Sequence, residues 1–152
     1  MTYMPFVVRR AQSEDLEAAL SLIATMFVDL GTTEIPESWN GDAEHALRTR
    51  AEAAAFVTVD DDRIVAVAVG LVEQRLPSPR RPDGRIGYVE WLATAVSDRR
   101  RGAARLAMDA LMAWFSEQGL KVVDVHASAA ASPLYRQLGF SEPQSTSLRR
   151  TL

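Results

Sequence analysis

The spacing of apolar residues changes several times along the chain, and each change marks a predicted element. Between Ser13 and Gly31, apolar side chains recur at the three- and four-residue spacing of an amphipathic helix. Ser13 is the expected N-cap of this helix, and Gly31 is expected to end it. Residues 42–54 are mostly strong helix formers and predict a second helix. The apolar face of the first helix consists of Leu16, Ala19, Leu20, Ile23, Phe27 and Leu30.

Short runs of β-branched and other apolar residues predict strands between and after these helices. The carboxylates of residues 60–62 precede Arg63 and indicate a solvated hairpin turn, because hairpin tips favour Asp; a cation site is the less favoured interpretation. Residues 74–84 contain three prolines and a glycine and predict an irregular loop. The predicted strands cover residues 6–10, 56–59, 64–72, 88–96 and 121–127, with weak strands from Phe140 onward.

A long amphipathic helix follows the fourth strand almost directly and ends at Gly119. A shorter helix is expected over residues 133–138, where proline is tolerated in the first turn. The element order is β-α-α-β-β-β-α-β-α-β, which predicts the α/β class with an α+β mixed sheet and one domain over residues 1–152. The strands at 88–96 and 121–127 should be parallel, because a helix connects them.

Composition narrows the classes of protein that fit. With 47% hydrophobic and 24% charged residues, the chain has the composition of a soluble globular protein. No apolar run is long enough to span a membrane, and the N-terminus lacks a signal-peptide pattern, so we expect a cytoplasmic protein without a membrane partner. The absence of cysteine excludes disulfides and cysteine nucleophiles. His45 and His126 lie far apart in the sequence and suggest no metal site.

The most informative segment is the junction between the fourth strand and the long helix. Arg99, Gly102 and Ala104 are spaced R-x-x-G-x-A. The first N–H groups of a helix lack intrahelical acceptors, and the helix dipole adds positive potential there. With little side-chain bulk in the way, these groups can bind a phosphate. The spacing therefore indicates a pyrophosphate site, although a plain strand–turn–helix with solvated arginines explains the same residues. It is neither a P-loop nor a Rossmann fingerprint.

A second segment, SPLYRQLGF at residues 132–140, follows an apolar strand. Together the two segments resemble the GNAT acetyltransferase superfamily. The resemblance implies that the R-x-x-G-x-A turn holds the pyrophosphate of coenzyme A and that Tyr135 lies beside the thioester sulfur. This chain has Val96 where many members have proline, and Ser128 where many have asparagine. The implied coenzyme contacts are Leu92, Ala93, Thr94, Arg99, Arg100, Arg101, Gly102, Ala103, Ala104, Arg105, Ser128, Ser132, Leu134 and Tyr135.

The resemblance also implies that the fourth and fifth strands splay apart and that the pantetheine arm lies between them. A bulge near Ala93–Thr94 would then hold the acetyl carbonyl, where a backbone N–H can stabilise the oxyanion. The leaving thiolate needs a proton, and Tyr135 is the expected acid.

The base is a separate question. Strand alternation puts Glu90 on one face with Leu92 and Thr94, and a buried carboxylate there could accept a proton. Glu90 facing solvent or pairing with Arg85 is the alternative. His126 is a further candidate for the base, although a structural role fits it better.

The acceptor side has a weaker pattern. Residues 31–44 contain four carboxylates and no Lys or Arg, and Trp39 lies among them. Glu34, Trp39 and Glu90 are therefore expected to attract a cationic amine, although an ordinary solvated loop explains the same residues.

The sequence thus predicts an N-acetyltransferase that uses acetyl-CoA and acts on a primary amine, most simply that of a small molecule. The alternative is a non-catalytic acyl-CoA-binding or regulatory module. The net charge of −3 argues against nucleic acid as a partner. No metal is expected, and a homodimer is left open.

Overall fold

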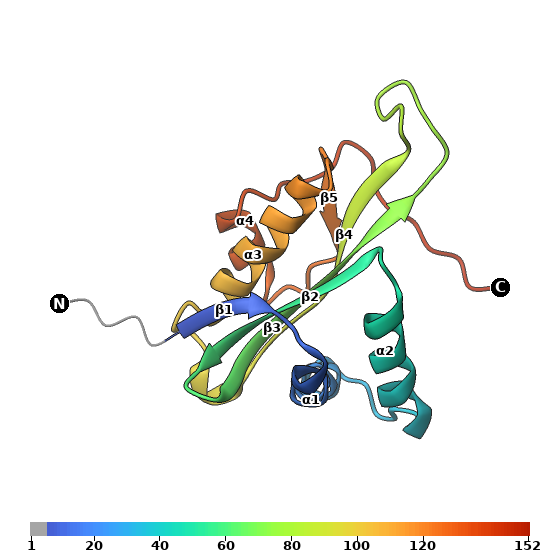
Figure 1. Cartoon of the computed structure of the whole chain (residues 1–152). Helices are drawn as coiled ribbons and strands as arrows, with labels where there is room; N and C mark the ends of the chain where they lie inside the picture. The colour runs from blue at the N-terminus through green and yellow to red at the C-terminus, as the bar shows by residue number, and fades with distance from the viewer. Residues whose placement is uncertain (1–5) are drawn as a thin grey trace.

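The computed structural model describes residues 6–152, in which one mixed sheet carries helices on both faces (Figure 1). Its strands follow chain order, with antiparallel pairing from β1 to β4 and a parallel pair between β4 and β5. Residues 1–5 lie outside the described residues. Part of the expected single domain, and the N-terminus expected to lack a signal-peptide pattern, fall on them. The strands are β1 Phe6–Arg10, β2 Ala53–Asp60, β3 Arg63–Gln74, β4 Arg85–Thr94 and β5 Val123–Val125.

Two helices cover each face of the sheet. The first two helices lie on one face, and the third and fourth lie on the other (Figure 1). The predicted parallel crossover is confirmed, because α3 connects β4 to β5. The helices are α1 Leu16–Asp29, α2 Glu37–Thr49, α3 Ala103–Glu117 and α4 Ser132–Gln137, and two 3-10 turns, η1 Ser13–Asp15 and η2 Val96–Asp98, precede α1 and α3.

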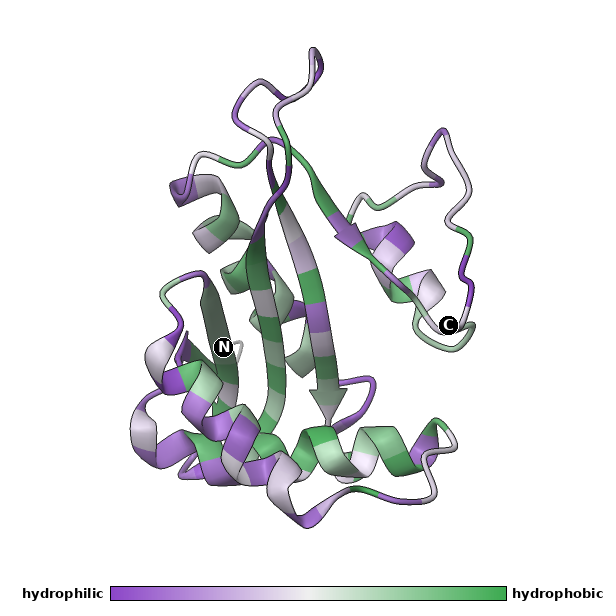
Figure 2. Cartoon of the chain, turned by 90° about the vertical axis from the view of Figure 1, so that its right-hand side faces the viewer, coloured by the Kyte–Doolittle hydropathy of each residue, from purple (hydrophilic) through white to green (hydrophobic). Residues whose placement is uncertain are grey.

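The core has a layer on each side of the sheet, and β3 contributes to both. Val67 and Val69 pack towards α1, whereas Ala68 packs towards α3. Figure 2 shows the central strands as mostly hydrophobic, as expected for strands buried on both faces. At Gly70, an added Cβ would lie 2.6 Å from a ring carbon of Phe115, so only glycine permits α3 to pack this closely.

Several predicted boundaries are wrong, for physical reasons. The first helical turn begins at Ser13 with Gln12 as its cap, because the carboxylate of Asp15 accepts the Gln12 N–H at 2.7 Å. The second helix covers residues 37–49 instead of 42–54. Ala53, Ala54 and the next residue are good helix formers, but they are buried in β2, where sheet pairing and burial outweigh helix propensity.

The weak strands expected after Phe140 are absent from the part of the chain that the structure describes. Residues 138–152 contain no helix or strand. The few large apolar side chains of the last segment do not form an alternating pattern, and Leu148 is 91% exposed. Such a segment has no apolar face with which to pair in a sheet. No helix within residues 6–152 is long and apolar enough to cross a membrane.

Candidate active site

A β-bulge interrupts β4 at Glu90. Trp91 is opposite Val69, and Val89 is opposite the next residue of β3, so Glu90 has no partner of its own in the ladder. The expected bulge near Ala93–Thr94 is therefore wrong in position and lies a few residues earlier, because Ala93 and Thr94 remain in regular register with β3. A bulge adds local twist and redirects a side chain, and bulges are frequent beside active sites.

The bulge also changes the face to which Glu90 belongs. Trp91 packs in the core layer of α1, whereas Val89 and Leu92 pack in the layer of α3. The extra residue thus shifts the alternation by one position, and the expectation that Glu90, Leu92 and Thr94 share a face is wrong.

The side chain of Glu90 is exposed, yet desolvation by the surrounding chain raises its pKa, and the neighbouring carboxylate of Glu73 raises it further. The suggested pair with Arg85 is absent, because the Arg85 guanidinium donates to the carbonyl of Gln118 at 2.8 Å. Glu90 and Glu73 also raise the pKa of Tyr88, after the larger effect of burial. These groups therefore form one acidic region on the α1 side of β4.

Strand β5 pairs with only the first half of β4. The paired residues run from Gly87 with Val123 to Val89 with Val125, and pairing ends just before the bulge. Figure 2 shows the two strands diverging beyond this point. The splayed arrangement expected from the sequence is present, and it begins where Glu90 interrupts the ladder.

Tyr135 lies at the centre of α4 and is only 6% exposed. Its ring packs edge-to-face against Phe140, with ring centroids 5.5 Å apart. Burial raises the pKa of Tyr135 to about 12, and the nearby Tyr88 hydroxyl adds to the shift. No hydrogen bond of the Tyr135 hydroxyl is found among residues 6–152, so this group remains available to a ligand.

The turn before α3 presents unpaired backbone donors. Within residues 6–152, the N–H groups from Arg100 to Arg105 have no backbone or side-chain acceptor. Gly102 is the residue before the helix and has φ +83°, a conformation that favours glycine. Its Cβ direction is open, with nothing within 4 Å. Unpaired donors at the start of a helix are groups that can bind phosphate, and the pyrophosphate contact stays a prediction.

The arginines of this turn differ in their surroundings. Arg99 forms an exposed ion pair with Asp29 of α1 at 3.2 Å. Arg101 contacts the buried Asp98 at 2.7 Å. In the described part of the chain, Arg100 and Arg105 have no ion-pair partner within 4 Å and remain available to an anion.

The small residues beside these arginines differ in exposure. The methyl group of Ala103 is buried in the core, so only its backbone can face a ligand, whereas Ala104 is partly exposed. The Oγ of Ser128 accepts the N–H of Ala131 at 3.2 Å and helps to begin α4.

Aromatic residues connect the acceptor-side predictions to the bulge. Trp39 of α2 packs edge-to-face with Trp91, with centroids 6.0 Å apart, and with Phe27 at 5.7 Å. Trp39 and the bulge at Glu90 are thus on the same face, whereas Glu34 is exposed and forms no side-chain hydrogen bond or ion pair within residues 6–152. The sequence pattern did not indicate Trp91 or Tyr88 as site residues. With uninterrupted alternation, Trp91 would lie on the other face of the strand.

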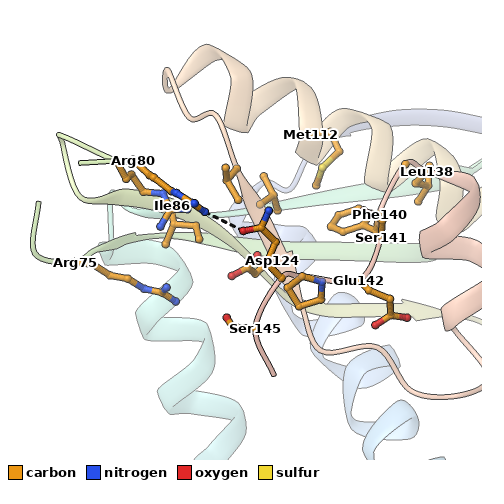
Figure 3. Close-up of a pocket in the computed structure, with 16 residues that line it drawn as sticks. Arg75, Arg80, Ile86, Met112, Asp124, Leu138, Phe140, Ser141, Glu142 and Ser145 are labelled. Carbon is orange, nitrogen blue, oxygen red and sulfur yellow. Dashed lines mark hydrogen bonds between the residues drawn. The ribbon is translucent and has the colours of Figure 1, made fainter. Parts of the chain in front are cut away.

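A groove lies elsewhere on the molecule. It has a volume of about 750 Å³ and lies beside β5, between the β3–β4 loop and residues 138–145 (Figure 3). Arg80 crosses it to donate to Gln144 at 2.9 Å. Neither Tyr135 nor Glu90 lines this groove, and neither does the turn before α3. Its lining is therefore separate from the groups that carry the chemistry described above.

Several solved structures share the fold of this chain. A predicted acetyltransferase from Clostridium acetobutylicum, solved with acetyl-CoA, is 18% identical, with a TM-score of 0.84 over 95% of this chain and 96% of that one. A GCN5-related N-acetyltransferase from Ralstonia eutropha is 22% identical, with a TM-score of 0.82 over 95% and 98%. An aminoglycoside acetyltransferase from an uncultured soil metagenomic sample, in complex with trehalose, is 21% identical, with a TM-score of 0.76 over 97% of both chains.

No curated protein sequence matches the chain significantly. The structural likenesses show the fold, and the sequence itself matches a family model. That model describes the acetyltransferase (GNAT) family and matches residues 19–140, which include the bulge, the turn before α3 and Tyr135. The chain therefore belongs to the GNAT acetyltransferase family.

Proposed function

We propose that this protein transfers the acetyl group of acetyl-CoA to the primary amine of a small molecule. The observation that carries the proposal is the run of unpaired backbone N–H groups from Arg100 to Arg105 at the start of α3. Such donors, together with the helix dipole and two available arginines, suit a pyrophosphate. Acetyl-CoA supplies the acetyl group, and the diverging ends of β4 and β5 lead from the turn towards Glu90 and Tyr135.

In the proposed reaction, the neutral amine attacks the thioester carbonyl, and the carbon–sulfur bond then breaks. Glu90 accepts the proton of the amine, directly or through water, because a carboxylate with a raised pKa is the better base. A backbone N–H of the bulge at Glu90, instead of one at Ala93–Thr94, stabilises the oxyanion.

The Tyr135 hydroxyl donates a hydrogen bond to the departing sulfur. Its raised pKa keeps it protonated at neutral pH, as an acid requires. Full transfer to a thiolate of ordinary pKa, about 8.5, is uphill, so its main effect is a hydrogen bond that strengthens as charge develops on sulfur.

The acceptor is proposed to be cationic in its resting form. Glu73 and Glu90 place negative charge beside the bulge, and Trp39 and Trp91 provide an aromatic wall behind it. Negative charge raises the local concentration of a cationic amine, and aromatic faces bind cations when exposed to them. Glu34 of the α1–α2 loop stays a candidate for the outer part of this region.

A turnover screen of small amines with acetyl-CoA, read by release of free thiol, tests the proposal. We expect release that depends on the amine and that is greatest for cationic primary amines. Binding of coenzyme A without amine-dependent thiol release across the library would favour a non-catalytic acyl-CoA-binding module. Absence of both binding and release would refute the proposed function.

A further inference from the structure

An ion cluster forms around the buried carboxylate of Asp98, in the segment before α3. The Asp98 carboxylate is only 1% exposed, and its two oxygens together accept hydrogen bonds from three side chains. Arg63 donates to both oxygens, at 2.7 and 3.2 Å, and Arg101 donates to Oδ1 at 2.7 Å. The hydroxyl of Ser97 donates to Oδ2 at 2.9 Å. Two of the three donors, Arg63 and Arg101, are charged, and charge-assisted hydrogen bonds are the stronger ones, so the carboxylate is held firmly in place.

The cluster joins two segments that are distant in the sequence. Arg63 is the first residue of β3, whereas Asp98 and Arg101 flank the turn before α3. The Arg101 guanidinium also lies 4.8 Å from the centroid of the Phe6 ring. The turn is thus fixed to the sheet through Asp98, and the Arg101 guanidinium is held by Asp98 and Phe6.

The fixed turn has a backbone that a free peptide would avoid. Arg100 has φ +65°, a left-handed conformation that costs energy for a residue with a Cβ. Arg100 lies between Asp98 and Gly102 in the sequence, and the φ of Gly102 is also positive. Strained positions persist where the surrounding structure over-determines them, and they cluster at ligand sites. Here the constraint is the hydrogen bonding of Asp98, which precedes Arg100, to Arg63 and to Arg101, which follows it.

We infer that Asp98 is a positioning residue, which holds the turn from Arg99 to Gly102 in the conformation that binds the pyrophosphate of the coenzyme. This inference rests on the proposed function. In it, Arg101 anchors the turn, and Arg100 and Arg105 meet the phosphates. The lowered pKa of Asp98, about 2, agrees with a carboxylate that stays charged at every working pH, mainly through the Arg63 hydrogen bonds.

Electrostatics and positioning make opposite predictions for Asp98→Asn. The substitution removes a negative charge beside an anion site, so simple Coulomb attraction would strengthen coenzyme A binding. If Asp98 positions the turn, binding weakens in spite of the added positive charge. We expect the dissociation constant for coenzyme A to rise about tenfold or more, the size of effect that outer-shell substitutions have at metal sites.

The experiment measures binding of two probes, coenzyme A and pantetheine, to the full chain. Pantetheine lacks the pyrophosphate, so its affinity should not change in Asp98→Asn, and the preference for coenzyme A should fall. With acetyl-CoA as substrate, KM should rise while kcat at saturation stays near that of the wild type. Equal or tighter binding of coenzyme A, or an equal loss for both probes, would overturn the inference.

The chain offers a matched control for loss of a buried carboxylate. Asp15 is 5% exposed and accepts two hydrogen bonds from Arg9, far from the turn before α3. Asp15→Asn should lower the melting temperature and leave the preference for coenzyme A unchanged.

If Asp98→Asn does not fold, Arg63→Gln tests the same anchor from its half-exposed side, and it should raise the dissociation constant for coenzyme A in the same direction. A normal constant in folded Arg63→Gln would then overturn the inference. Failure of the wild type to bind coenzyme A would instead refute the proposed function.

Discussion

Gly102 and Gly119 lie at opposite ends of α3 with almost the same backbone conformation, φ +83° and +80°. At both positions the direction of a Cβ is open, with nothing within 4 Å. Any substitution therefore imposes the same left-handed strain at either end, about 1–2 kcal/mol. The two glycines differ in what surrounds them, because only Gly102 adjoins the unpaired N–H groups. The pair separates backbone strain from loss of a ligand site.

Gly102→Glu should abolish the rise in melting temperature that coenzyme A causes. The new side chain enters the phosphate site with a negative charge, and a ligand stabilises a protein only to the extent that it binds the folded state. Gly119→Glu should lose similar intrinsic stability and keep the full shift. Thermal melts with and without coenzyme A measure both. A normal shift in folded Gly102→Glu would put the phosphate site elsewhere.

Glu90→Gln should lower turnover mostly near neutral pH. There the acceptor amine is protonated and needs a base, whereas at higher pH free amine becomes abundant and activity should partly return. Because the folded pKa of Glu90 is raised, stability is lost as the pH rises from the unfolded pKa through the folded pKa, and the loss is complete above it. The variant should therefore melt at the same temperature or higher at pH 7. A pH–rate profile identical to that of the wild type would leave Glu90 without a role as base.

Tyr135→Phe should retain the fold and coenzyme affinity, because the ring that packs on Phe140 is preserved. Turnover should fall by roughly 10²–10³-fold, the range for loss of one preorganised hydrogen-bond donor to a charge that develops in the transition state. Since the pKa of Tyr135 is about 12, the wild type should show no alkaline loss of activity from this group in the usual assay range. Steady-state kinetics measures this on an acceptor whose chemical step is rate-limiting. Near-normal turnover would mean that another group stabilises the departing thiolate.

Gly70→Ala should destabilise the fold by about 1–3 kcal/mol, the usual cost of overpacking a core. The added methyl would lie 2.6 Å from Phe115 and 2.8 Å from Leu111, so α3 must shift. Gly41→Ala is the matched control, because nothing lies within 4 Å of its Cβ position and it is inside α2. This control should gain up to about 1 kcal/mol from helix propensity. Denaturant unfolding compares the two, and equal effects would contradict the close packing at Gly70.

The order of the elements from β1 to α4 could be predicted from the sequence, because it depends on local pattern; only the final strands were wrong. The two motifs could be recognised for the same reason. Alternation and helical spacing identified the strands and long helices, and the α3 turn was recognised from residue types at fixed spacing. Boundaries depended on tertiary contacts. Ala53 and Ala54 prefer a helix by propensity, but in the fold they pair with β3 and are buried. Helix propensity alone contains no information about that pairing.

The bulge was the least predictable part of the site. Nothing in YVEWLAT distinguishes a regular strand from one with an extra residue at Glu90, because each assignment buries a plausible set of apolar side chains. Only the opposing strand decides, through the register of Val69 and the next residue. The Asp98 cluster was likewise hidden, since its partner Arg63 lies 35 residues away in the sequence. Both features are relations between segments, which single-sequence patterns do not encode.

The shortness of β5 has a consequence for how the molecule moves. This strand pairs with β4 over only three residues, whereas β3 is twelve residues long and has a strand on each side. Amide protons of β5 should therefore exchange with solvent through local opening, and those of β3 only through global unfolding. Separating β5 from β4 disturbs little of the cooperative structure. We therefore expect a ligand arm to enter between these strands while the rest of the sheet stays closed.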